Sequence, residues 1–154
     1  MRFKLPLIVV DDINTSRKFY EDVLNQKVIL DFGANITFTG DFSLQSKESW
    51  VDLIRKTENE ILSKPDNFEL YFEEEQFDKF IERLKSFKVQ YVHDVVQYSW
   101  GQRVIRFYDP DMHIIEVGES MVNVVKRFIT QGLTIEQTAK QTQHPVEFVK
   151  DCMV

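Results

Sequence analysis

The spacing of apolar and polar residues in the first third of the chain predicts a strand, a helix and three further strands. Residues 3–10 form an apolar run that suits a first strand, and two aspartates close it. Asn14 or Thr15 is placed to cap a helix that extends to about Leu24, because the apolar residues there recur at helical spacing. Three short strand candidates follow, at residues 28–32, 35–39 and 42–46.

The same order of elements recurs in the second part of the chain. A strand at residues 68–73 precedes a helix whose apolar face follows the i, i+3, i+4, i+7 pattern through Phe77, Phe80, Ile81 and Leu84. Three more strand candidates lie at residues 89–93, 102–108 and 114–118. The chain therefore contains two βαβββ units, and a repeated supersecondary unit is a direct indication of architecture.

The repeat predicts an α+β fold with a cup-shaped sheet. Each unit offers one helix to four strands, so one face of each sheet is left uncovered. Two such sheets, paired, form an open eight-stranded cup with a cleft on the concave side. We expect the two units to span residues 1–46 and 68–119, with a connector at 47–67 and a helical C-terminal extension at 120–154.

The C-terminal extension has the pattern of three short helices. The first is amphipathic and ends at Gly132, and Thr134 with Gln137 makes a capping box for the second. Pro145 suits the first position of the third. This order resembles a helix-turn-helix, but residues 121–154 hold four Lys or Arg and three Asp or Glu, whereas DNA binding requires several phosphates to be neutralised. We expect a packing or dimer-contact segment instead of a DNA reader.

Composition narrows the class of protein. The chain is 43% hydrophobic with 13 phenylalanines, enough for an ordinary globular core. A net charge of −6 argues against an extended nucleic-acid surface, and no apolar run is long enough to cross a membrane. The first residues do not have the pattern of a signal peptide, so a cytoplasmic location is the default expectation. Cys152 is the single cysteine, which excludes an intramolecular disulfide and a thiolate metal cluster.

A carboxylate lies in an unusual position in the last hairpin of the repeat. Glu116 stands between Ile115 and Val117, in the strand that follows an Asp-Pro-Asp turn. A buried or cleft-lining carboxylate must be solvated, paired, protonated or bound to a metal. Strand alternation places Gln45 and Glu69 on the corresponding faces of their own strands, away from the helices.

Three segments of the chain together resemble the glyoxalase / bleomycin-resistance / extradiol-dioxygenase superfamily, also called the vicinal oxygen chelate superfamily. They are DDINTSRKFYEDVL, FEEEQFDKFIERLK and RFYDPDMHIIEVGE, and the resemblance covers residues 3–119. One departure is Met112, where the family usually has glycine. The resemblance implies a small-molecule site in the cup and a homodimer.

The resemblance also implies a metal held by one residue from each of four strands. In this chain those positions fall on Leu5, Gln45, Glu69 and Glu116. Leu5 has no donor atom, and no two histidines are placed for a dioxygenase set. The oxygen ligands Gln45, Glu69 and Glu116 suit a hard ion such as Mg²⁺ or Mn²⁺, with Ni²⁺ a further candidate. The alternatives are solvated carboxylates, pairing with Arg103 or Arg106, or a metal-free pair of carboxylates that transfers a proton.

Candidate ligand contacts cluster at the predicted rim of the second unit. Trp100 offers a flat apolar surface and Arg103 a forked donor for a carboxylate, while Gly101 permits a close backbone approach. The candidate binding residues are His93, Tyr98, Trp100, Gln102 and Arg103.

Three functional hypotheses follow. The first is a glyoxalase-like lyase or isomerase, in which a metal chelates vicinal oxygens and Glu116 or Glu69 moves a proton. The second is a metal-free protein of the bleomycin-resistance type that binds a small molecule, favoured by Leu5 and by the acidic charge. A regulator that binds DNA through the C-terminal extension is the least favoured.

Overall fold

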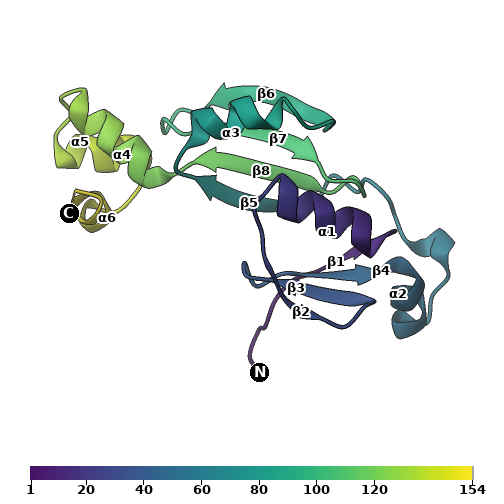
Figure 1. Ribbon diagram of the computed structural model, residues 1–154. Helices are drawn as coiled ribbons and strands as arrows, with labels where there is room; N and C mark the ends of the chain where they lie inside the picture. Colours follow the sequence, from purple (N-terminus) through teal and green to yellow (C-terminus); the bar gives the residue numbers. More distant parts are fainter. Residues whose placement is uncertain (154) are drawn as a thin grey trace. The chain divides into compact units, whose positions relative to one another are not determined.

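Each βαβββ repeat forms a four-stranded mixed sheet with the same strand order (Figure 1). The first sheet runs β1-β4-β3-β2, and the second runs β5-β8-β7-β6. In each, the first strand pairs parallel with the fourth and the other pairs are antiparallel. The predicted repeat and the α+β class are confirmed. The strands are β1 Leu7–Val10, β2 Val28–Asp31, β3 Asn35–Phe38, β4 Ser43–Ser46, β5 Glu69–Glu74, β6 Tyr91–Gln97, β7 Arg103–Tyr108 and β8 Ile114–Glu119.

This computed structural model describes residues 1–153, which divide into two compact units. The first unit contains Met1–Phe68 together with the turn Asp109–His113. The second contains Glu69–Tyr108 and the chain from Ile114 onward, including the C-terminal helices. No helix among the described residues is long and apolar enough to cross a membrane.

Helix α1, Ile13–Asp22, covers one face of the first sheet. Its Tyr20 ring lies against Phe38 and Phe42, with ring centroids 5.5 and 5.3 Å away. The cap differs from the prediction: Asp12, and not Asn14 or Thr15, precedes the helix and accepts a 2.6 Å hydrogen bond from the Thr15 amide. The aspartate side chain is short enough to reach that amide from the extended backbone of the N-cap position.

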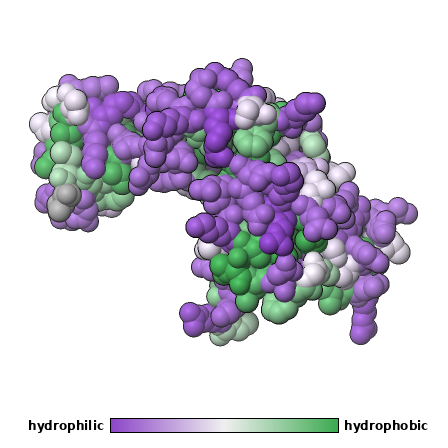
Figure 2. All heavy atoms as spheres, in the orientation of Figure 1, coloured by the Kyte–Doolittle hydropathy of each residue, from purple (hydrophilic) through white to green (hydrophobic). Residues whose placement is uncertain are grey.

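The connector contains helix α2, Lys47–Ile54, and a single 3-10 turn, η1, Glu58–Glu60. At the far edge of the first sheet, strand β2 and the turn after it leave apolar side chains in solvent: Ile29, Leu30 and Phe32 are 52, 51 and 72% exposed. Hydrophobic residues are visible on the surface of this unit in Figure 2.

Helix α3, Phe77–Leu84, covers one face of the second sheet. It buries Phe77, Phe80 and Leu84, and the Phe80 ring lies 6.4 Å from that of Phe107 on β7. Strand β6 extends from Tyr91 to Gln97, later than the predicted 89–93, and its register with β7 shifts twice within the strand.

The C-terminal extension forms helices α4 Met121–Thr130, α5 Ile135–Thr142 and α6 Val146–Asp151. Val125, Ala139, Val149 and Cys152 form a small apolar core of their own. The predicted Thr134–Gln137 capping box is present at the start of α5. Pro145 is the N-cap of α6 instead of its first helical residue.

Candidate ligand-binding cluster on the second sheet

The face of the second sheet opposite helix α3 carries polar side chains from neighbouring strands. Glu116 on β8 pairs in register with Tyr71 on β5 and with Arg106 on β7. Because residues in register share a face, and residues two apart along a strand also do, Glu69 lies on this face with them. We call this face the polar face of the second sheet.

Arg106 is the centre of the polar face. Its Nε donates a 2.9 Å hydrogen bond to Glu69 Oε2, and its Nη2 forms an ion pair with Glu116. Its Nη1 donates to the Tyr98 hydroxyl at 2.7 Å and lies 3.3 Å from His93 Nε2. Four of the predicted site residues, Glu69, Glu116, His93 and Tyr98, therefore converge on one guanidinium.

The cluster carries a net negative charge, because two carboxylates pair with one guanidinium. The Glu116 side chain is 9% exposed, whereas that of Glu69 is 39% exposed. Burial of Arg106 opposes its charge, but the hydrogen bonds to Glu69 and Tyr98 outweigh this effect, so that the pKa of Arg106 is raised. Glu116 thus acts as the buried partner of a cation, and Glu69 remains within reach of solvent.

A second chain of hydrogen bonds runs beside Arg106. Trp100 Nε1 donates to Gln102 Oε1 at 3.1 Å, and Gln102 Nε2 donates to the Tyr71 hydroxyl at 2.7 Å. The Tyr71 hydroxyl donates in turn to Glu73 at 2.8 Å, and burial raises the pKa of Tyr71 to about 12. A Cβ on Gly118 would lie 2.6 Å from Gln102 Nε2, so the glycine makes room for this chain.

The Tyr98 and Trp100 rings stack, with centroids 4.5 Å apart and planes 12° from parallel. Stacking of this kind holds both rings as one flat surface. The tyrosine hydroxyl is bonded to Arg106 and the indole N–H to Gln102, so both polar ends are satisfied.

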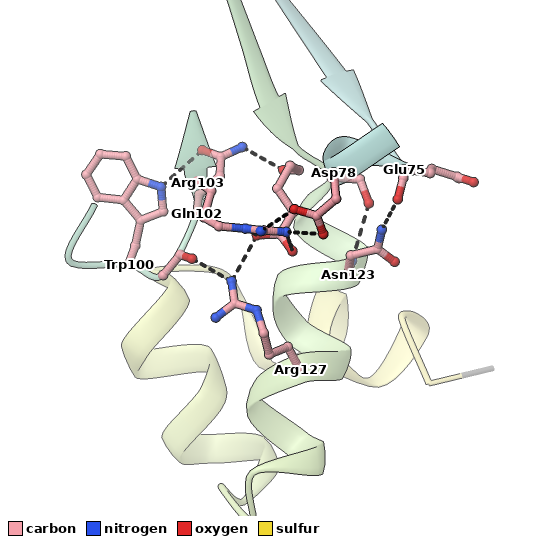
Figure 3. A network of polar contacts seen from close by, with 10 residues as sticks. Glu75, Asp78, Trp100, Gln102, Arg103, Asn123 and Arg127 are labelled. Carbon is pink, nitrogen blue, oxygen red and sulfur yellow. Dashed lines mark hydrogen bonds and ion pairs between the residues drawn. The ribbon is translucent and has the colours of Figure 1, made fainter. Parts of the chain in front are cut away.

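Arg103 lies outside this cluster. Its guanidinium forms ion pairs with Asp78 (Figure 3), at 2.7 Å, and with Glu119, at 3.1 Å. The guanidinium also lies over the Phe77 ring, 5.1 Å from the ring centroid. Hydrogen bonds to Glu119 and Asp78 raise its pKa. Arg103 therefore lies on the face that α3 covers. Its ion pairs correspond to the alternative in which Arg103 pairs with carboxylates and does not bind a ligand.

The four positions that correspond to family metal ligands do not fit a divalent ion held in the family's manner. Leu5, just before β1, supplies no donor. Gln45 Oε1 accepts from Asn35 at 2.9 Å, and its Nε2 donates to the Ser49 hydroxyl. Both glutamates, Glu69 and Glu116, are paired with Arg106. Within residues 1–153, no group of three or more His, Cys, Asp or Glu side chains is arranged to hold a metal.

Arg106 is the important residue that the candidate list did not contain, although it was considered as an ion-pair partner. The signal was available in strand alternation. Phe107 and Ile105 are apolar core residues, so Arg106 between them must point to the opposite face. The same reasoning places Arg103 with Ile105 and Phe107, away from the ligand cluster.

A second buried polar cluster in the first unit was not predicted. The Tyr20 hydroxyl donates to Asp109 at 2.8 Å, and the Ser16 hydroxyl donates to Asp111 at 2.6 Å. His113 Nδ1 lies 2.9 Å from the same Asp109 carboxylate. Every oxygen of the Asp109 and Asp111 carboxylates has a hydrogen-bond partner. The cluster therefore stabilises the turn.

Residues 3–122 match the family model for the glyoxalase-like domain. This chain belongs to that family. A solved structure of a protein of unknown function from Agrobacterium tumefaciens is 39% identical, with 78% of this chain and 94% of that chain aligned at a TM-score of 0.70. Most of the C-terminal extension lies outside the family match. Among curated proteins, none matches the sequence.

More distant solved structures share the fold of this glyoxalase-like protein. The fosfomycin resistance protein FosX from Mesorhizobium loti is 17% identical, covering 82% of this chain and 97% of that chain at a TM-score of 0.57. A glyoxalase-related enzyme from Fulvimarina pelagi is 16% identical, covering 79% and 91% at a TM-score of 0.65.

Proposed function

We propose that this protein binds a small organic molecule on the polar face of the second sheet, without the metal that the family resemblance implies. The observation that carries the proposal is the pairing of Arg106 with both Glu69 and Glu116. A guanidinium already neutralises the charge that a divalent ion would neutralise there, and Leu5 leaves the family ligand set incomplete. The site therefore favours binding over metal-assisted chemistry.

The chemistry of the cluster favours a ligand that is cationic or rich in hydrogen-bond donors and that carries a planar ring. Two carboxylates face one guanidinium, and Glu69 is the more exposed of the two. Tyr71, which is 48% exposed, and the stacked Tyr98–Trp100 pair supply aromatic surfaces. A ligand cation beside such rings gains cation–π attraction as well as the ion pair.

The test is a binding screen with cationic aromatic compounds, followed by calorimetry on variants. Glu69→Gln removes one negative charge that faces solvent, and we expect affinity to fall about tenfold. Trp100→Ala removes half of the stacked surface and is expected to weaken binding by a similar factor. The matched control is Glu82→Gln, a change of an exposed carboxylate on α3. Wild-type affinity in both Glu69→Gln and Trp100→Ala would rule out this site.

The alternative is metal-dependent lyase or isomerase chemistry on vicinal oxygens, which the resemblance to glyoxalases favours. Native mass spectrometry of untagged protein supplied with Mn²⁺ or Ni²⁺ separates the two functions. We expect no stoichiometric ion. A bound ion that disappears in Glu116→Gln would replace our proposal with the metal-dependent one. Homodimerisation and the lack of nucleic-acid and membrane binding remain predictions from the sequence.

A further inference from the structure

We infer that the C-terminal helices position the binding site, through contacts that Arg127, Phe128 and Gln141 make with the loop at residues 98–102. This loop, which we call the rim loop, joins β6 to β7 and carries Tyr98 and Trp100. The role of these contacts in ligand binding rests on the proposed function, whereas the contacts themselves do not.

Hydrogen bonds from two helices hold the backbone of the rim loop. Arg127 on α4 donates from Nη2 to the Gly101 carbonyl at 2.7 Å, as Figure 3 shows. The same nitrogen donates to Glu119 at 2.9 Å, and Gln141 on α5 donates to the Ser99 carbonyl at 2.5 Å. Glu119 is buried and also pairs with Arg103, so its carboxylate is held in place. Arg127 is therefore anchored to Glu119 at the same nitrogen that bonds the rim loop.

A close packing contact reinforces these bonds. A Cβ on Gly101 would lie 2.3 Å from Cζ of Phe128 and 3.3 Å from Val124, so the helix presses directly on the loop backbone. Gly101 also has a φ of +92°, which disfavours other residues. Gly101 was expected to permit a close approach to the backbone, and the group that approaches it here is the Phe128 side chain of α4.

The other side of the rim loop faces the polar cluster. The loop is closed by hydrogen bonds between Tyr98 and Gln102 and between Gly101 and Tyr98, both 2.9 Å. Tyr98 accepts from Arg106, and Trp100 stacks on Tyr98. A movement of the loop backbone at Gly101 therefore moves the aromatic surface and one hydrogen-bond partner of Arg106.

The test compares neighbouring residues of α4 in a Trp50→Phe background, where Trp100 is the one remaining tryptophan of the two. Arg127→Met and Phe128→Leu change residues that touch the rim loop. The control Lys126→Met changes an exposed neighbour on the same helix. Near-ultraviolet circular dichroism and Trp100 emission report the stacked pair without any ligand, and calorimetry reports affinity for the compound found in the screen.

We expect Arg127→Met and Phe128→Leu to reduce the near-ultraviolet signal and to weaken binding about tenfold, with no change in Lys126→Met. Gln141→Ala, a surface change that leaves the helix core intact, is expected to have a smaller effect of the same sign. If Arg127→Met fails to fold, the Trp100 signal of Gln141→Ala still tests whether the helices position the rim loop.

Folded variants with an unchanged Trp100 signal would overturn the inference, even when Glu69→Gln weakens binding. A changed Trp100 signal with no ligand found would leave the positioning role standing and would count against the proposed function alone.

Discussion

The hydroxyl of Tyr20 donates a 2.8 Å hydrogen bond to the carboxylate of Asp109, a residue 89 positions later in the chain. Asp109 also accepts from the amides of Asp111 and His113, at 2.9 and 2.8 Å. Both groups are buried, Tyr20 completely and Asp109 to 3% exposure. One carboxylate thus organises the whole turn at residues 109–113 and fixes it to helix α1.

We expect Asp109→Ala to lower the free energy of unfolding by about 3 kcal/mol, because it leaves several buried donors without an acceptor. Tyr20→Phe removes a single donor and should cost about 1 kcal/mol. Urea denaturation measures both. Tyr91→Phe, at a tyrosine that is 39% exposed, serves as the control and should change little. An equal, small effect of all three changes would contradict this account of the turn.

The stability of the first unit should depend on pH through His113. Burial opposes its charge, but the hydrogen bond and charge of Asp109 outweigh burial and raise the pKa of His113. A raised pKa in the folded state stabilises the fold below the unfolded value of about 6.5, and this contribution is lost as pH rises through the folded pKa. Wild-type protein should therefore lose stability as pH rises from about 6.5 through the raised pKa of His113. In His113→Gln that loss should disappear; a slope that persists would assign the dependence to another group.

Met112 has a φ of +69°, in the left-handed region that glycine adopts freely. A side chain there costs about 1 kcal/mol, so Met112→Gly should raise the free energy of unfolding by up to about that amount. Met112→Ala is the matched control, because it removes the same side chain but keeps the Cβ. Thermal unfolding of the two variants distinguishes backbone strain from loss of contacts. A gain in the alanine variant equal to that in the glycine variant would argue against strain.

Gly118 leaves the space that Gln102 occupies. We expect Gly118→Ala to displace the Gln102 amide from Tyr71 and to cost about 2 kcal/mol through overpacking. The loss should appear in denaturant unfolding and as a shift in Trp100 emission, since Trp100 donates to Gln102. Gly40→Ala is the control, as a Cβ there meets its neighbours at 3.4 Å, an ordinary contact. Unchanged emission in Gly118→Ala would show that the hydrogen-bond chain does not hold the indole.

Strand alternation was sufficient to predict much of the fold and the face of each glutamate. Glu69 and Glu116 lie on the polar face because the side-chain period of a strand is two and the pairings of β8 with β5 and β7 are regular. The choice between Arg103 and Arg106 was open to the same argument, since Arg103 shares the parity of Ile105 and Phe107.

Other features depend on contacts that no local pattern contains. Gly101 leaves room for Phe128, which lies 27 positions later on helix α4. The Asp109 cluster requires Tyr20 from the first repeat. The helix cap at Asp12, by contrast, was a local error, because several capping residues stand close together and propensity alone does not rank them.

The pairing of Arg106 with two carboxylates has a consequence for the conditions under which this protein can work. An arginine keeps its charge at every physiological pH, and no chelator or shortage of metal removes it. Under the proposed metal-free binding, the polar face of the second sheet is complete as soon as the chain folds. Its readiness for a ligand would then be set by how much folded protein the cell contains, independent of the supply of any ion.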